Sequence, residues 1–139
     1  MKKYGEILTP QVFGEVALSD WIPLNDDGSP ITDESVFLKD KGLLDRAEVL
    51  VAEVTKPSLG VGYEIGVAEA RGIPILLLHK KGILVSPMVK GNTKFISKEY
   101  KDVEETEGII DEFFEGLKWV FSYIFHLRKN VLLKNNFLD

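Results

Sequence analysis

Cysteine is absent from this 139-residue chain, which excludes thiol catalysis, disulfide bonds and thiolate metal sites in one step. Histidine is scarce as well. His79 and His126 are the only two and lie far apart in the sequence, which argues against a histidine-rich metal site. The sequence therefore predicts neither a bound metal ion nor a cofactor.

Basic residues are outnumbered: 17 lysines and arginines stand against 22 aspartates and glutamates, for a net charge of −5. Binding DNA or RNA as a polymer needs a basic surface, so we expect no nucleic-acid polymer as a partner. A single phosphate remains a candidate ligand, because backbone N–H groups at the start of a helix can hold it. No signal peptide or membrane-spanning run is visible, so we expect no membrane partner and a cytoplasmic protein.

The chain shows no internal repeat and no linker long enough to separate domains. We therefore expect a single domain over residues 1–139, large enough for a real hydrophobic core. Residues 47–72 are its most informative stretch. There, an apolar run at 49–54, broken only by Glu53, predicts a strand that is buried on both faces.

A helix-like segment follows that strand, and its first turns hold Gly60, Gly62 and Gly66. Each glycine inside a helix costs roughly 1 kcal/mol relative to alanine, so three of them need a reason. The usual reason is close approach of the backbone, either to a neighbouring strand or to a ligand at the helix N-terminus. Because Glu64 lies among these glycines, the stretch is typical of a small-molecule site.

Residues 71–74, Arg-Gly-Ile-Pro, predict the end of that helix, and residues 75–78 form a second apolar strand. A strand, a helix and a strand in succession imply parallel pairing with a right-handed crossover, and thus an α/β fold. The other expected elements are a strand at 4–9, a short helix at 12–18, a loop at 21–32, a helix from Thr32 or Asp33 to about Leu44, a loop or short helix at 80–91, an edge strand at 94–96, and a long amphipathic helix whose apolar pattern runs from Val103 to Leu127. The aromatic face of that last helix fits a cover for the sheet, a dimer contact, or both.

The sequence VAEVTKPSLGVGYEIG, at residues 51–66, closely resembles the signature of the 2'-deoxynucleoside 5'-phosphate N-hydrolases. These enzymes belong to the nucleoside 2-deoxyribosyltransferase superfamily. The resemblance extends through residues 3–9, Asp40 and residues 85–91, and covers about residues 2–100. It implies a flavodoxin- or Rossmann-like parallel sheet with flanking helices. It also implies hydrolysis of 2'-deoxynucleoside 5'-monophosphates to a free base and 2-deoxyribose 5-phosphate.

Glu64 matches the nucleophile of that family. A carboxylate can attack the anomeric carbon of a nucleotide to form a glycosyl-enzyme ester, through a transition state that resembles an oxocarbenium ion. Water then completes hydrolysis, whereas a second nucleobase would make the enzyme a deoxyribosyltransferase. Asp40 matches the aspartate that contacts the departing base and assists its protonation. Without the resemblance, Glu64 would be a solvent-facing helix acid and Asp40 a surface acid.

Two serines match residues that bind the 5'-phosphate in the family. Ser58 precedes the glycine helix, where an N-cap role alone would also explain it. Ser86 matches a serine that reaches the phosphate in the partner subunit's site, and is otherwise an ordinary turn or N-cap residue. The resemblance thus implies a homodimer with a shared site, and the phosphate favours the hydrolase over the transferase. The expected substrate-binding residues are Ser58, Gly60, Gly62, Ser86, Pro87 and Met88.

One departure from the family stands out. Its members begin with a hydrophobic strand, central in the sheet, and a glycine-rich loop that supplies a tyrosine and an arginine to the site. This sequence starts at Met1, where the family's second strand begins, so we expect the first strand and helix to be lacking. A sheet without its central strand would need different strand pairing, exchange between subunits, or cover by the C-terminal helix. The missing loop also favours a third reading, a non-catalytic nucleotide-binding or assembly protein.

Overall fold

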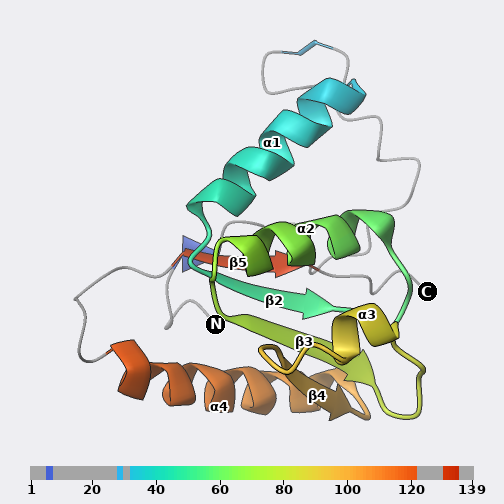
Figure 1. Ribbon diagram of the computed structural model, residues 1–139, viewed down its shortest axis with the longest axis vertical. Helices are drawn as coiled ribbons and strands as arrows, with labels where there is room; N and C mark the ends of the chain where they lie inside the picture. Colours follow the sequence, from blue (N-terminus) through green and yellow to red (C-terminus); the bar gives the residue numbers. More distant parts are fainter. Residues whose placement is uncertain (1–5, 8–27, 30–31, 122–129, 135–139) are drawn as a thin grey trace.

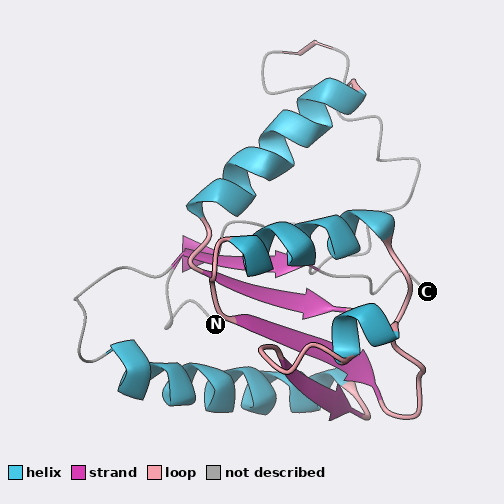
Figure 2. Cartoon of the chain, in the orientation of Figure 1, coloured by secondary structure: helices cyan, strands magenta, loops and turns pink. Residues whose placement is uncertain are grey.

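The computed structural model describes residues 6–7, 28–29, 32–121 and 130–134. Five parallel strands form one sheet in the order β1-β5-β2-β3-β4, with helices on both faces (Figures 1 and 2). The elements in chain order are β1 (Glu6–Ile7), α1 (Asp33–Arg46), β2 (Val49–Glu53), α2 (Leu59–Ala70), β3 (Ile75–Lys80), α3 (Pro87–Lys90), β4 (Ile96–Tyr100), α4 (Val103–Phe121) and β5 (Asn130–Lys134). The predicted α/β class is confirmed.

The sheet is built around β2. All five residues of β2 are buried, and it pairs in parallel with β3 on one side and β5 on the other. Because successive side chains of a strand point to opposite faces, β2 contributes to two cores. Leu50 and Ala52 pack with residues of α1 and α2, whereas Val49 and Val51 pack with residues of α4. The prediction of a strand buried on both faces is confirmed.

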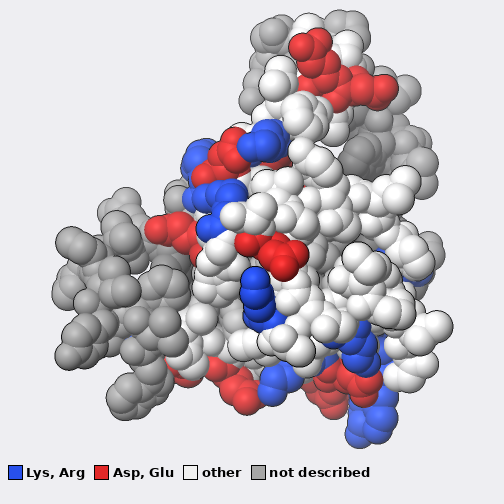
Figure 3. Space-filling model, viewed as in Figure 1, with Lys and Arg blue, Asp and Glu red and all other residues white. Residues whose placement is uncertain are grey.

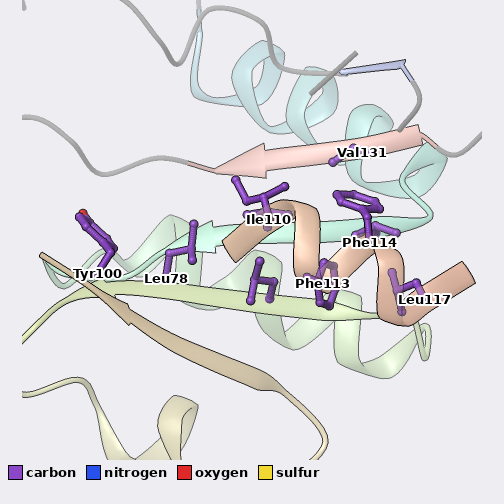
Figure 4. Close-up of a cluster of buried hydrophobic side chains, with 10 residues drawn as sticks. Leu78, Tyr100, Ile110, Phe113, Phe114, Leu117 and Val131 are labelled. Carbon is purple, nitrogen blue, oxygen red and sulfur yellow. The ribbon is translucent and has the colours of Figure 1, made fainter. Parts of the chain in front are cut away.

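α4 covers the second face of the sheet and contributes to a cluster of buried apolar side chains, called the α4 cluster below (Figure 4). Phe113 and Phe114 meet edge to face, with ring centroids 5.5 Å apart. The predicted role of this helix as a cover for the sheet is therefore confirmed. None of the helices that the structure describes has the length and apolar character needed to cross a membrane. The buried members of the cluster are Val49, Val51, Leu76, Leu78, Tyr100, Ile110, Phe113, Phe114, Leu117 and Val131.

α2 ends as the sequence predicts. Gly72 takes a φ of +69°, a left-handed conformation that glycine adopts readily, and its N–H donates to the carbonyl of Glu69 at 2.9 Å. The N–H of Ile73 reaches back to the carbonyl of Ala68 at 3.2 Å, which completes a Schellman motif. This turn leads directly into β3. The predicted strand, helix and parallel strand are all present.

α1 begins with a reciprocal cap. The hydroxyl of Thr32 accepts from the N–H of Ser35 at 3.1 Å, and the hydroxyl of Ser35 accepts from the N–H of Thr32 at 2.9 Å. The predicted N-cap at Thr32 is confirmed. Only the last turns of the helix reach the sheet, where Leu44 is buried (Figure 1). Phe37 and Leu38 are 50% and 59% exposed, so the apolar stripe of α1 is only partly covered.

Strand β5 was not predicted from the sequence. It lies between β1 and β2 and pairs in parallel with both, with Val131 opposite Val49 and Lys134 opposite Ala52. This is the central position at which the resemblance places the family's first strand. Of the three alternatives for such a sheet, different strand pairing and cover by the C-terminal helix are both present, whereas exchange between subunits stays a prediction. A short apolar run carries no periodicity that separates strand from helix, which is why the sequence did not reveal it.

Other expectations change in extent. The edge strand predicted at 94–96 is β4, which begins at Ile96 and is an edge strand but not the last in the chain. The predicted C-terminal helix is α4, which the structure describes only as far as Phe121. The helix predicted at 12–18, the end of the C-terminal helix at 122–127, most of the loop at 21–32 and most of the strand at 4–9 lie outside the described residues.

The position of β5 can be tested by placing a charge in it. Val131 is 2% exposed within the α4 cluster, so Val131→Asp buries a carboxylate without a partner. We expect the free energy of unfolding to fall by about 3 kcal/mol or more, as for other unpaired charges in a core. Urea denaturation measures this. Val103→Asp, at a position that is 53% exposed, is the control. Equal stability of the two variants would contradict a buried β5.

Candidate active site

The amino-terminal end of α2 lies at the carboxyl edge of the sheet, where β2 ends. Ser58 is the N-cap residue, and its hydroxyl accepts a hydrogen bond from the N–H of Val61 at 3.3 Å. The first turn of α2 contains no acidic residue. The partial positive charge of the helix end and its first N–H groups are therefore not offset by a local carboxylate. Such an end favours an anion, for example a phosphate.

The glycines of α2 do not approach a neighbouring strand, so that alternative is wrong. Among the described residues, a Cβ at Gly62 or Gly66 would meet no atom within 4 Å. A Cβ at Gly60 would meet only the hydroxyl oxygen of Ser58, at 3.9 Å. All three glycines are exposed. The other alternative, approach of a ligand at the N-terminus of α2, stays a prediction.

Glu64 is in the second turn of α2 and is only 8% exposed. It is therefore not the solvent-facing acid that a surface helix would carry. Asp40 lies on α1 and is half-buried. The two helices touch next to these acids, since the rings of Phe37 and Tyr63 meet edge to face with centroids 6.5 Å apart. Asp40, three residues after Phe37, lies on the same face of α1 as this contact, whereas Glu64 directly follows Tyr63 and so belongs to a different, buried face of α2.

Ser86 precedes the short helix α3, which packs on the same side of the sheet as α2 (Figure 1). Its carbonyl accepts from the N–H groups of Val89 and Lys90, but its hydroxyl makes no capping hydrogen bond. The side chain is thus not explained as an N-cap. Met88 is 88% exposed and Pro87 is also exposed, so the side chains of these two residues face solvent and do not pack on the core.

The structure also reveals a group that the sequence analysis does not single out. Glu53, the last residue of β2, is 2% exposed. Its Oε1 accepts hydrogen bonds from the hydroxyl of Tyr100 at 3.0 Å, the N–H of Thr55 at 3.2 Å, and the hydroxyl of Thr55. An acid within the apolar run at 49–54 was the available signal of a special buried group.

No group of three or more histidine, cysteine, aspartate or glutamate side chains is placed to hold a metal ion in the described part of the chain. The groups that the candidate site offers are carboxylates, hydroxyls and backbone N–H groups.

Comparison with known proteins decides the family. The sequence profile of the nucleoside 2-deoxyribosyltransferase family matches residues 3–108. The chain belongs to this family. A protein of Syntrophotalea carbinolica named 2'-deoxynucleoside 5'-phosphate N-hydrolase 1 is 44% identical over 109 residues, which are 75% of this chain and 77% of that one.

Two vertebrate relatives are similar over a longer stretch. The 5-hydroxymethyl-dUMP N-hydrolase of Esox lucius is 39% identical over 122 residues, covering 84% of this chain and 81% of its own. The enzyme of the same name from Rattus norvegicus is 38% identical over 121 residues, covering 84% and 71%. The resemblance given by the α2 signature is thus confirmed. The family match ends at residue 108 and so includes α1, α2, α3 and β4, but not β5.

A pH titration of this member of the nucleoside 2-deoxyribosyltransferase family can test the buried hydrogen bond between Tyr100 and Glu53. Burial, reinforced by Glu53 and opposed by the hydrogen bond with Thr55, raises the pKa of Tyr100 to about 12. The folded pKa exceeds the ordinary 10.0, so the stability that neutral Tyr100 contributes is present below pH 10 and is lost as the pH rises through about 12. Absorbance titration should show one of the four tyrosines ionising late, with no such step in Tyr100→Phe. Ionisation of all tyrosines together near pH 10 would contradict it.

Proposed function

We propose that this protein hydrolyses the N-glycosidic bond of 2'-deoxynucleoside 5'-monophosphates, releasing a free base and 2-deoxyribose 5-phosphate. One observation carries the proposal: a buried carboxylate, Glu64, lies on the same face of α2 as Gly60, which is open beside the Ser58 cap. Residues four apart share a helix face. A phosphate bound at the start of α2 would therefore leave the attached sugar alongside Gly60, with its anomeric carbon within reach of Glu64. The names of the relatives agree with this chemistry.

In the proposed reaction the carboxylate of Glu64 attacks the anomeric carbon. The new ester bond forms as the bond to the base nitrogen breaks, and the base leaves with a proton that Asp40 delivers. Water then attacks the glycosyl ester, returns a proton to Asp40 and frees 2-deoxyribose 5-phosphate. The negative charge of Glu64 also stabilises the oxocarbenium-like transition state. Because Glu64 is mostly removed from water, that charge acts at a lower effective dielectric constant than at the surface.

The phosphate is the part of the substrate that the start of α2 fits best. The hydroxyl of Ser58, the first N–H groups of the helix and the absence of an acid in its first turn together favour a dianion. Gly60 and Gly62 leave the backbone open there. A nucleoside without a phosphate would leave these groups unused, so this site favours hydrolysis of nucleotides over transfer between nucleosides.

We also propose that the active unit is a homodimer with a shared site. Leu59 and Tyr63 are 96% and 53% exposed on the outward side of α2, which also carries the open positions Gly62 and Gly66. Two glycines four apart allow a second backbone to approach closely. Figure 3 shows a largely uncharged surface over α2 and α3 on this side. Exposed apolar area of this kind marks an interaction surface, and it would bring the Ser86 of one subunit towards α2 of the other.

The first test is incubation of the purified chain with each 2'-deoxynucleoside 5'-monophosphate and with 5-hydroxymethyl-dUMP, with free base measured by chromatography. The matching nucleosides are controls. Release from monophosphates alone supports the proposal. Base transfer to a second nucleobase, without net hydrolysis, would favour the transferase. Binding without any release would favour the non-catalytic nucleotide-binding protein.

If Glu64 is the nucleophile, a substitution that barely changes its size should still lower kcat strongly. Glu64→Gln keeps the size of the side chain but removes the nucleophile, so we expect kcat to fall by about a thousandfold or more while the thermal unfolding temperature stays near that of the wild type. Glu69→Gln is the matched control, because Glu69 lies on the exposed side of the same helix and accepts from Asn92. Turnover of Glu64→Gln near that of the control would show that another group attacks.

The shared site can be tested by mixing two weak variants. Ser86→Ala and Glu64→Gln damage the same composite site from different subunits, so a mixed dimer regains one intact site. After subunit exchange at equal concentrations, half of the dimers are mixed, and about a quarter of wild-type activity should return at low substrate concentration. Each variant incubated with itself is the control. Activity equal to the average of the two separate variants would argue that each site is complete within one subunit.

A further inference from the structure

The buried carboxylate of Glu53 has an unusual hydrogen-bond arrangement. One of its oxygens, Oε1, accepts all three hydrogen bonds, from Tyr100 and from the N–H and hydroxyl of Thr55. The other, Oε2, is buried and has no hydrogen-bond partner in the described part of the chain. Burying a carboxylate in this way costs free energy, and an apolar side chain of similar volume would often be as stable. Sheet stability alone therefore does not account for this residue.

Thr55 connects that carboxylate to a second strand. Its hydroxyl donates to Glu53 and accepts from the backbone N–H of Lys80, at 2.9 Å, at the end of β3. Tyr100 is the last residue of β4, and its ring lies at the end of the α4 cluster nearest the carboxyl edge of the sheet (Figure 4). The network thus ties together the carboxyl ends of β2, β3 and β4.

What the network holds is the turn that enters α2. Only Lys56 and Pro57 separate Thr55 from the cap residue Ser58. The ring of Pro57 fixes its own φ, so little freedom remains between the anchored Thr55 and the helix start. A shift of Thr55 would be passed on to Ser58 and to the first N–H groups of α2. Small displacements of such groups have large effects on binding and catalysis.

We infer that Glu53 is a positioning residue: through Thr55 it fixes the turn at residues 55–58 and, with it, the phosphate-binding end of α2. The inference deepens the proposed function and rests on it. Glu53 does not touch the substrate in the proposed reaction. It holds Thr55 through both the N–H and the hydroxyl of that residue, and the hydroxyl, which also accepts from the N–H of Lys80, is the group that a substitution can remove.

Thr55→Val removes the hydroxyl at nearly constant volume, whereas Thr55→Ser keeps it. We expect Thr55→Val to raise KM for a 2'-deoxynucleoside 5'-monophosphate by about tenfold, in line with the loss of one or two hydrogen bonds, with a smaller change in kcat. Affinity for the matching nucleoside, which has no phosphate, should change much less. Thr55→Ser should recover most of the lost affinity. Calorimetric affinities for both ligands are measured alongside turnover.

Two further variants separate positioning from stability. Thr106→Val removes a hydroxyl that donates to the carbonyl of Val103 in the first turn of α4, far from this turn, and should leave KM unchanged. Tyr100→Phe removes another donor to Glu53 while keeping the ring, and should raise KM in the same direction as Thr55→Val. It also serves if Thr55→Val does not fold.

The outcomes are distinct. Equal monophosphate affinity in the wild type, Thr55→Val and Tyr100→Phe would overturn the inference, as would equal losses for monophosphate and nucleoside. Equal impairment of Thr55→Val and Thr55→Ser would also overturn it. If the wild type binds the monophosphate and both Thr55→Val and Tyr100→Phe bind it more weakly, but no base is released, the inference holds and the hydrolase proposal fails. A wild type that binds no monophosphate would overturn both.

Discussion

Parallel pairing of β2 on both sides is the constraint on which the rest of the structure depends. Parallel strands need a crossover to connect them, and α2 is the crossover between β2 and β3. The carboxyl ends of β2, β3, β4 and β5 consequently point to one edge, and α2 starts there. In open α/β sheets this is the edge at which ligands bind. The site therefore follows from the strand pairing before any catalytic side chain is considered.

Burial of β2 on both faces also explains why its last residue is exceptional. Apolar side chains at positions 49–52 fill the two cores, and an acid at Glu53 interrupts the pattern just where the strand ends. A carboxylate there must be hydrogen-bonded or neutral, because water cannot reach it. Tyr100 and Thr55 supply the donors. The same burial that stabilises the sheet thus makes the geometry of the edge depend on a few polar contacts.

Much of this could be predicted from sequence, because the signals were local. The apolar run of β2, the turn at Gly72 and the cap at Thr32 each specify a structure over a few residues, and all three are present. The candidate residues of α2 could be identified because one continuous signature contains them. β5 could not, since a short apolar run specifies neither its partner nor its position in the sheet. The hydrogen bond between Glu53 and Tyr100 spans 47 residues, so no local pattern contains it.

β5 forms part of the surroundings of the candidate site, whereas the residue proposed to attack the substrate, Glu64, lies on α2. The family match covers α2 and ends at residue 108, whereas the strand beside β2 comes from residues 130–134. One side of the carboxyl edge is therefore built from family sequence, and the other from a segment that the match does not include. Lys134 ends β5 at a register position opposite Ala52, next to Glu53. The candidate nucleophile Glu64 and the turn before α2 thus lie within the family match, whereas contacts from the β5 side come from residues outside it.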